Sequence, residues 1–310
     1  MNAGADTIAY WRFEGDGATT PTDGTFLKDS NGRTTVTGDG ILAIDSSGNG
    51  NSLYTWDNGA TGHQYRNNVP AAIIPQTGAA NGFSIQNNGS FPASFTWSRE
   101  SSETVDVELI KPTAWTIEAS IYQTTGNQTG HRTFLGRDGN GVNAGNANAA
   151  SLYFKTYNAT LGIEFADEAG NWYSVYDTTG TLSLDTWYNV AAVSDGTAVS
   201  LYRDSGTGYQ LVNALSLTAG DTRLAYDDNG SSTVGDTQWS WTVGRGRYGT
   251  NDEQSQNHVD RWLGYVDEVR ISDTALNTGD LLFSVPEPGT AGLSVLGLLA
   301  LLLRRRAVQE

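Results

Sequence analysis

Carboxylates at short spacing are the residues of this chain that would be suited to hydrolytic chemistry. Hydrolysis of a glycosidic bond with retention needs two carboxyl groups about 5–5.5 Å apart, one as nucleophile and one as acid/base. The nearest arrangement is the stretch ETVDVE, in which Asp106 and Glu108 would share one face of a strand. Glu103 lies three residues before Asp106 and would point to the other face. The spacing therefore favours a solvated edge strand over a catalytic one, and we expect no catalytic residue.

Other catalytic arrangements are not visible either. The three histidines, His63, His131 and His258, are scattered, and none has metal-ligand spacing or lies beside a nucleophile motif. The sequence has no Gly-x-Ser-x-Gly motif and no phosphate-binding loop. It also has no cysteine, which excludes disulfides, thiolate zinc sites and cysteine nucleophiles. We therefore expect a protein that is not an enzyme.

A glycine-rich turn carries oxygen-bearing side chains that are suited to calcium. The ion takes about six to eight oxygen ligands, often carboxylate, amide and backbone carbonyl groups from one turn. Asp45, Asn49 and Asn51 in DSSGNGN offer such groups, and Asp267 with Glu268 on a late strand would complete the set. The alternative is a plain turn in which Asp45 caps its own backbone. The sequence leaves the two interpretations about even, and structural Ca²⁺ is the one cofactor that we expect.

Aromatic residues are the second group with binding chemistry, because exposed rings stack on the faces of sugars. The chain has 9 tryptophans. Those at strand positions are expected in the core: Trp11, Trp115, Trp187 and Trp262. Five aromatic residues beside turns are the candidates for a ligand-binding surface: Trp56, Trp97, Trp172, Tyr173 and Tyr248. Ordinary packing is the alternative for each of them.

Charge and composition restrict the class of protein. Lysine and arginine number 18 against 34 acidic residues, a formal net charge of −16. Such a surface repels phosphate backbones, so we expect no nucleic-acid partner. The 37 glycines indicate short strands and many turns. A chain of this length buries a large core without disulfides.

The elements that position these residues are strands. Apolar residues alternate with polar ones at 115–121, 161–165 and 239–243, which is the period of strands with one buried face. The run 187–193 is nearly apolar throughout and predicts a strand covered on both faces. The one helix that we expect outside the C-terminal tail covers a turn or two around Thr274–Leu282, with Asp273 as N-cap. This pattern predicts an all-β, two-sheet antiparallel sandwich.

The C-terminal tail has a different character from the rest of the chain. Pro286, Glu287 and Pro288 precede a 13-residue uncharged run at 291–303, and Arg304, Arg305 and Arg306 follow it. The prolines end the domain near Phe283, so we expect a domain at 1–284 and a separate segment at 285–310. As a helix the run is about 20 Å long, a short transmembrane helix with its arginines on the cytoplasmic side.

The tail, VPEPGTAGLSVLGLLALLLRRR, resembles the PEP-CTERM sorting signal. The resemblance implies recognition by an exosortase-type enzyme in the membrane and cleavage near the Pro-Glu-Pro motif. It further implies export to the cell surface or extracellular matrix of a Gram-negative bacterium, with transient anchoring in the inner membrane. The mature protein would then touch the membrane only before processing.

Four other stretches, in order, resemble the LamG-like (concanavalin A-like) jelly roll. They are AYWRFEGDG at 9–17, DSSGNGN at 45–51, TIEASI at 116–121 with LSLDTWYNVAAVSDGTAVSLYRD at 182–204, and GYVDEVRISDTAL at 264–276. The resemblance implies a jelly-roll sandwich spanning residues 8–283, which would place Trp11 and Phe13 inward. Family members often hold a structural calcium near the second stretch.

Together these features predict an exported surface or matrix protein that binds carbohydrate, the cell's own exopolysaccharide, without catalysis. Two alternatives stay open at this point. One is a secreted glycoside hydrolase or lyase on the same scaffold, and the other is a protein-binding adhesin module. Fold alone does not separate them, because one sandwich hosts unrelated functions.

Overall fold

The computed structural model describes residues 7–15, 20–25, 41–55, 63–87, 96–97, 112–124, 129–137, 151–218, 222–224, 241–244, 246 and 260–285. Within these residues the chain forms sixteen strands and one short 3-10 helix. Neighbouring strands pair antiparallel throughout. The predicted all-β, antiparallel class is therefore confirmed.

The larger sheet has eight strands, and its order is β14-β13-β12-β7-β16-β5-β4, with β1 also paired to β16. Its members are β1 (Thr7–Trp11), β4 (Gln64–Arg66), β5 (Ser84–Asn87), β7 (Trp115–Gln123), β12 (Trp187–Ser194), β13 (Ala198–Asp204), β14 (Gln210–Ser216) and β16 (Gly264–Ser272). The last strand of the chain, β16, lies in the interior of this sheet. One of its edges pairs with β7, and the other is divided between β5 and β1.

The smaller sheet has five strands in the order β11-β10-β9-β8-β15. They are β8 (His131–Arg137), β9 (Leu152–Tyr157), β10 (Thr160–Ala166), β11 (Trp172–Tyr176) and β15 (Trp241–Val243). Three short strands form a separate piece: β2 (Ile41–Ala43), β3 (Leu53–Thr55) and β6 (Thr96–Trp97). These short strands correspond to the less regular first third of the sequence.

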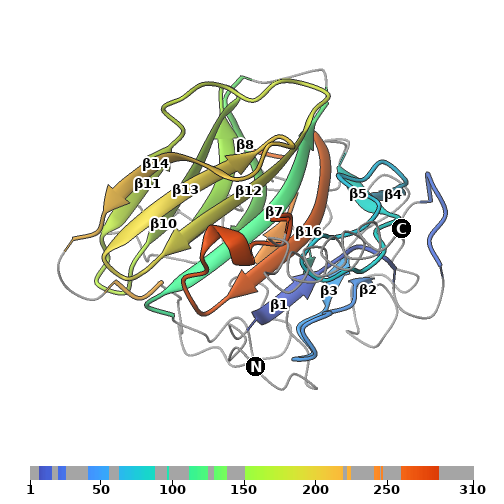
Figure 1. Cartoon of the computed structure of the whole chain (residues 1–310), viewed down its shortest axis with the longest axis horizontal. Helices are drawn as coiled ribbons and strands as arrows, with labels where there is room; N and C mark the ends of the chain where they lie inside the picture. The colour runs from blue at the N-terminus through green and yellow to red at the C-terminus, as the bar shows by residue number, and fades with distance from the viewer. Residues whose placement is uncertain are drawn as a thin grey trace, which may run out of the picture.

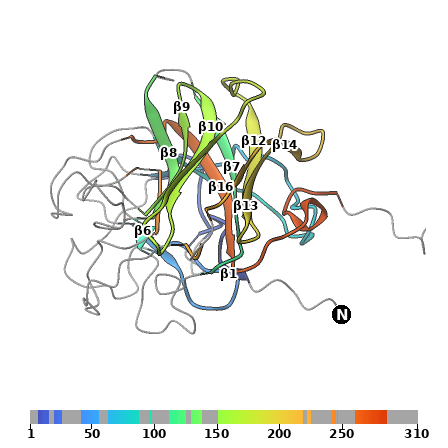
Figure 2. The same cartoon turned by 90° about the vertical axis from the view of Figure 1, so that its left-hand side faces the viewer.

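The two main sheets lie face to face as the layers of a sandwich (Figures 1 and 2). Side chains from both sheets meet between them, as where the Trp115 ring on β7 lies edge-on to Phe165 on β10, with ring centroids 5.3 Å apart. Trp11, Phe13 and Trp262 are also fully buried, as predicted. Trp187 is not, because it lies half-buried on the other face of the larger sheet. This face is called the outer face below.

The C-terminal part of the domain covers one end of the outer face. The 3-10 helix η2 (Thr278–Asp280) crosses in front of β7 and β16 (Figure 1). The segment after it is fixed because the Leu282 amide donates to the buried Glu118 carboxylate at 2.9 Å, and Arg270 also pairs with Glu118. The expected helix at 274–282 is therefore wrong in extent, and Asp273 does not cap it. Asn277 precedes η2 and makes no side-chain cap bond.

A bulge in β16 sets which side chains face outward. Apolar residues follow the period of two in most of this strand, but Val266 and Val269 are three apart. The register with β7 shifts between Asp267 and Arg270, and Glu268 has a positive φ of 48°. The extra residue returns Val269 to the core, where it is fully buried. Asp267 and Glu268 lie within the bulge, and both carboxylates are buried.

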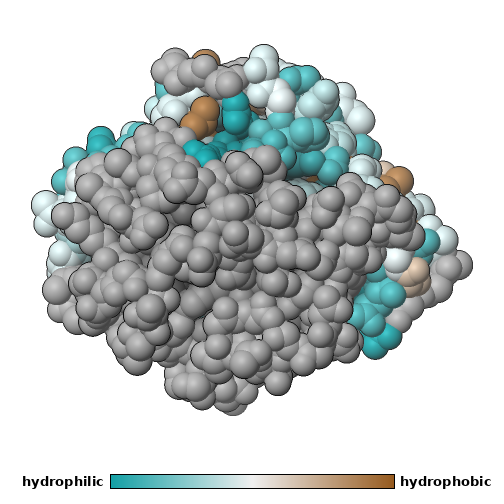
Figure 3. Space-filling model, turned by 180° about the vertical axis from the view of Figure 1, so that it is seen from behind, coloured by the Kyte–Doolittle hydropathy of each residue, from teal (hydrophilic) through white to brown (hydrophobic). Residues whose placement is uncertain are grey.

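The surface seen from behind carries no extended apolar area among the described residues. In Figure 3 the coloured residues are mostly hydrophilic, and the hydrophobic ones are isolated. The described residues include no helix that is long and apolar enough to cross a membrane. The sorting residues and the apolar run after them lie outside the described residues.

Candidate functional site

Three aromatic rings lie side by side on the outer face of the larger sheet. They belong to Trp187 on β12, Tyr122 on β7 and Tyr265 on β16, and Tyr122 is the register partner of both others. Ring centroids are 5.5 Å apart for Tyr122 and Trp187, and 5.1 Å apart for Tyr122 and Tyr265. All three side chains are half-buried and therefore keep part of each ring in contact with solvent. We call these three residues the aromatic row.

Two glutamines continue the aromatic row across the sheet. Gln86 on β5 is the register partner of Tyr265, and Gln64 on β4 is the partner of Gln86. Both are half-buried, as the aromatic residues are. The line from Trp187 to Gln64 thus crosses five strands and places rings at one end and amides at the other.

Polar neighbours hold two of the rings in place. The Trp187 indole N–H donates to Asn68 Oδ1 at 3.0 Å. Partial burial and then the Asp185 carboxylate, which accepts a hydrogen bond from the phenol, raise the pKa of Tyr122. Asp185 adopts a positive φ of 54°, a conformation that Asp tolerates better than most residues. Its amide donates to Gln123 O at 2.9 Å, which fixes this turn against the end of β7.

Gly264 allows β16 to begin beside the end of β7. Its φ is +154°, and a Cβ placed on it would lie 1.9 Å from the carbonyl oxygen of Tyr122. No side chain fits in that space. The register between Tyr265 and Tyr122, and with it the contact between their rings, therefore depends on glycine at this position.

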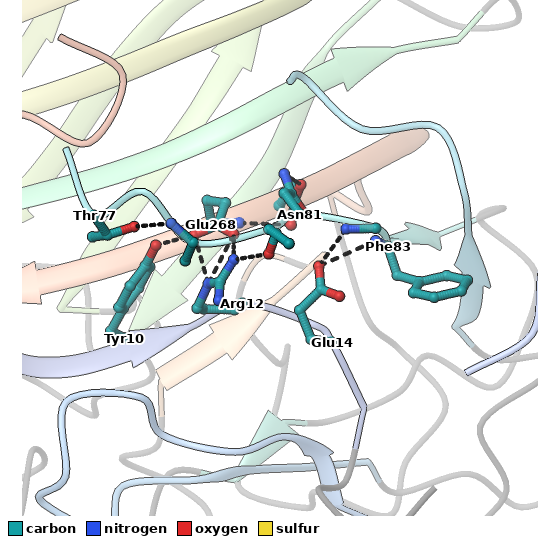
Figure 4. Close-up of polar contacts among 11 residues, drawn as sticks. Tyr10, Arg12, Glu14, Thr77, Asn81, Phe83 and Glu268 are labelled. Atoms are coloured by element: carbon teal, nitrogen blue, oxygen red, sulfur yellow. Dashed lines mark hydrogen bonds and ion pairs between the residues drawn. The ribbon is translucent and has the colours of Figure 1, made fainter. Parts of the chain in front are cut away.

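A cluster of charged and polar residues surrounds Glu268 of β16 (Figure 4). The Tyr10 hydroxyl donates to Glu268, and Arg12 pairs with the same carboxylate at 3.1 Å. Asn81 donates to Asp267 Oδ2 at 2.9 Å. Burial raises the pKa of Glu268 to about 6, against the opposing effect of Arg12, and burial also raises the pKa of Asp267. These contacts join β1, β16 and the segment before β5.

Glu14 extends these contacts to the start of β5, because its carboxylate accepts the amides of Gly82 and Phe83 (Figure 4). Every carboxylate of this cluster is thus bonded to a neighbouring element. The geometry fits a structural clamp, and the Glu268 side chain has no exposed surface for a ligand.

The turn that was considered for calcium is fastened to β1. Asp45 accepts hydrogen bonds from the amides of Tyr10, Ser47 and Asn51 and from the Ser47 hydroxyl, at 2.7–2.9 Å. The Asn49 and Asn51 amides donate to the backbone carbonyl of Ile8 at 3.0 and 2.9 Å. This is the geometry of a turn in which an Asp caps the backbone.

Asp267 and Glu268 take other partners, as described above. No group of three or more His, Cys, Asp or Glu side chains suited to a metal ion occurs in the part of the chain that the structure describes. Calcium binding stays a prediction. If the ion contributes to folding, a chelator lowers the melting temperature of the full chain, and added calcium restores it. An unchanged melting temperature removes calcium from the account.

The other candidate residues are distributed over the molecule. Tyr173 is 5% exposed and stacks on Phe165, so its ring belongs to the core. Trp172 is half-buried at the start of β11, edge-on to Tyr153 with ring centroids 6.2 Å apart. Trp97 lies in β6. Trp56 and Tyr248 lie outside the described residues, as do the carboxylates of the ETVDVE stretch.

The aromatic row itself was missed by sequence reasoning. Trp187 begins an apolar run and was expected in the core, and Tyr122 and Tyr265 were not singled out. The sequence does place large aromatic residues at the ends of expected strands, which could have indicated the aromatic row. Recognising the row also requires knowing that β12, β7 and β16 are neighbours in the sheet.

Comparison with known proteins identifies the C-terminal tail. Residues 284–306 match the model described as the PEP-CTERM protein-sorting motif. No curated protein matches the chain in sequence. The predicted sorting signal is thus confirmed. It indicates an exported protein with a transient membrane anchor, and it implies processing by an exosortase.

The solved structures that share the fold include the following two. Domain 4 of AbnA, an extracellular arabinanase of Geobacillus stearothermophilus, was solved in complex with arabinotriose and is 15% identical, with a TM-score of 0.50. The match covers 90% of this chain and 97% of that domain. The binding domain of Paraclostridial Mosquitocidal Protein 1 is 14% identical with a TM-score of 0.51, over 90% of this chain and 52% of that one. The protein is therefore a two-layer β-sandwich that carries a PEP-CTERM sorting signal.

Proposed function

We propose that this protein is a non-catalytic glycan-binding protein of the cell surface or extracellular matrix of a Gram-negative bacterium. The single observation that carries the proposal is the aromatic row, three rings in mutual contact on a solvent-facing sheet surface. Sugar rings have apolar faces that stack on such side chains, and their hydroxyl groups need nearby amides and carboxylates. Asn68, Asp185 and Gln86 supply these groups.

The export signal supports the same function. A protein that is delivered outside the cell and processed by an exosortase meets the exopolysaccharide that the cell secretes. Domain 4 of AbnA, which shares the fold, is a carbohydrate-bound domain by its description. We further propose that the sandwich is a LamG-like jelly roll and that the apolar run 291–303 is a short transmembrane helix until it is removed. In this proposal a bound calcium ion stabilises the fold and does not contact the glycan.

The proposal predicts that Trp187→Ala weakens glycan binding. Removing the indole takes away the largest ring of the aromatic row, and its N–H no longer holds Asn68. Because buried or half-buried tryptophans dominate binding surfaces, we expect the dissociation constant to rise by about tenfold or more. Affinity electrophoresis of the full chain in gels that contain neutral polysaccharides measures this change.

The matched control is Tyr157→Ala. Tyr157 is an aromatic residue that is 45% exposed, but it lies on β9 of the smaller sheet. Its removal should leave retardation in the gel as it is in the unchanged protein. If the two variants lose binding equally, or if the unchanged protein binds no polysaccharide, the aromatic row is not a glycan site and the adhesin alternative gains.

A further inference from the structure

We infer that the glycan is an extended, uncharged chain that lies across the strands of the larger sheet, from the aromatic row to Gln64. This inference rests on the proposed function and specifies the class of ligand. Three observations support the inference: the direction in which the outer face is open, the length of the line from Trp187 to Gln64, and the charges beside this line.

The outer face is open across the strands and closed along them. Moving along the strands from the aromatic row, the next outward residues are Asn189, Ser120 and Asp267. Ser120 donates to Asn189 Oδ1 at 2.7 Å, and Asn189 donates to Asp204 Oδ2 at 3.2 Å. Ser120 and Asp267 are fully buried. These polar groups satisfy one another, so a ligand finds its free surface on the aromatic row and on the glutamines that continue it.

The length of this line exceeds that of a single sugar. It crosses five strands, and four interstrand steps of about 4.8 Å give a length of about 19 Å. One pyranose ring covers one aromatic side chain. A ligand that contacts both Trp187 and Gln86 therefore has several consecutive units and an extended shape, and its contacts change from ring stacking to hydrogen bonds along its length.

The charges beside the line exclude acidic glycans. Asp185 is bonded to the Tyr122 phenol and places a carboxylate beside the aromatic row. Arg66, two residues after Gln64, is engaged with Asp23 at 3.3 Å. With the formal net charge of −16 on the whole chain, this face repels carboxylated polymers. Neutral sugars experience no such repulsion.

The test is a series of neutral oligosaccharides of one linkage, from disaccharide to hexasaccharide, titrated into the full chain by calorimetry. Series from β-glucan, xylan and arabinan are used, with alginate and polygalacturonate as acidic polymers. Affinity should rise with length by about tenfold over the series and then level off, while the acidic polymers should bind at least about tenfold more weakly.

Variants divide the site into its two ends. Gln86→Ala should reduce the gain from length, so that the hexasaccharide loses more affinity than the disaccharide does, whereas Trp187→Ala should weaken every member of the series. Gln210→Ala is the matched control, because Gln210 is an exposed glutamine on β14 of the same sheet. Near-UV circular dichroism of each variant verifies that the aromatic side chains keep their packing.

The outcomes separate the two proposals. Equal affinity for all lengths, or loss of the length dependence in Gln210→Ala as well, overturns the extended ligand and leaves glycan binding standing. Tighter binding of alginate than of every neutral series overturns the uncharged class. Absence of binding to all of these polymers removes the proposed function itself.

Discussion

Substitution of Gly264 by alanine is expected to destabilise the protein by about 3 kcal/mol or more, because the new Cβ would be driven into the backbone of the neighbouring strand. The nearest atom, the carbonyl oxygen of Tyr122, would be 1.9 Å from this Cβ, and the next two, Tyr122 C and Gln123 Cα, are backbone atoms that cannot move aside as the end of a side chain can. A loss of this size lowers the melting temperature of a chain of this length by roughly 6–12 °C. Calorimetric or circular dichroism melting curves measure it.

Substitutions at two other glycines separate the steric clash of the new Cβ from the backbone strain of a positive φ. Gly279 in η2 has nothing within 4 Å of its ideal Cβ, so Gly279→Ala should change the unfolding free energy by less than about 0.5 kcal/mol. Gly78 has a φ of +68° and equally open surroundings, so Gly78→Ala reports backbone strain alone, about 1–2 kcal/mol. If Gly264→Ala is as mild as Gly78→Ala, the close approach of β16 to β7 is not as described.

Acid is expected to destabilise the fold through one buried histidine. His63 precedes β4, is fully buried, and lies against Gly244 and Asn87 where the two sheets meet. Burial lowers the pKa of His63 from 6.5 to about 4, although a hydrogen bond with Val243 opposes the shift. The folded state thus takes up its proton later than the unfolded state does. Its stability contribution is fully present above pH 6.5 and is lost as the pH falls towards 4, about 3 kcal/mol in all.

Buried carboxylates give a slope of the opposite sign. Burial raises the pKa of Glu118 and raises that of Glu268 from 4.5 to about 6, so each carboxylate stabilises the fold in acid and loses that contribution as the pH rises, for Glu268 between about 4.5 and 6. Between about pH 4.5 and 6 the loss at Glu268 opposes the gain at His63, so the unfolding free energy should rise less steeply with pH in this range than His63 alone would make it.

The contribution of His63 to the pH dependence of stability is measured by comparing two histidine variants. His63→Gln should lower the slope of the unfolding free energy against pH between about pH 4 and 6.5, measured by urea denaturation, and leave the curve above pH 6.5 unchanged. His131→Gln controls for loss of a histidine, because His131 is half-buried and packs on Tyr157 at the edge of the smaller sheet. An acid slope that persists in His63→Gln contradicts this account.

Local sequence pattern was sufficient for the strands and insufficient for the site. Alternation in β7 identified the apolar face, on which Trp115, Ile117 and Ile121 are buried. The expectation of only one buried face was wrong, because Glu118 and Ser120 on the polar face are buried as well. The residues of the aromatic row behave differently. Tyr122, Trp187 and Tyr265 come together only through the register of strands that lie far apart in sequence, and no local pattern specifies that register.

Two other expectations depended on what covers each side of a strand. Trp187 was assigned to the core because its neighbours are apolar, and it faces outward because it alternates with the buried Tyr188 and Val190 along β12. Tyr173 was assigned to the surface because a turn precedes it. It packs inward because its hydroxyl bonds to Asp167 and accepts the amide of Thr218.

The interior position of β16 has a consequence for how the chain is made. Tyr10 and Glu268 are 258 residues apart in sequence, yet they are bonded in the finished sheet. Until β16 has left the ribosome, β7, β5 and β1 have no strand between them, and loop closure over so long a segment is slow. The sheet is therefore completed only when the residues directly before the sorting signal arrive. The larger sheet of the nascent chain therefore stays incomplete for nearly the whole of its synthesis.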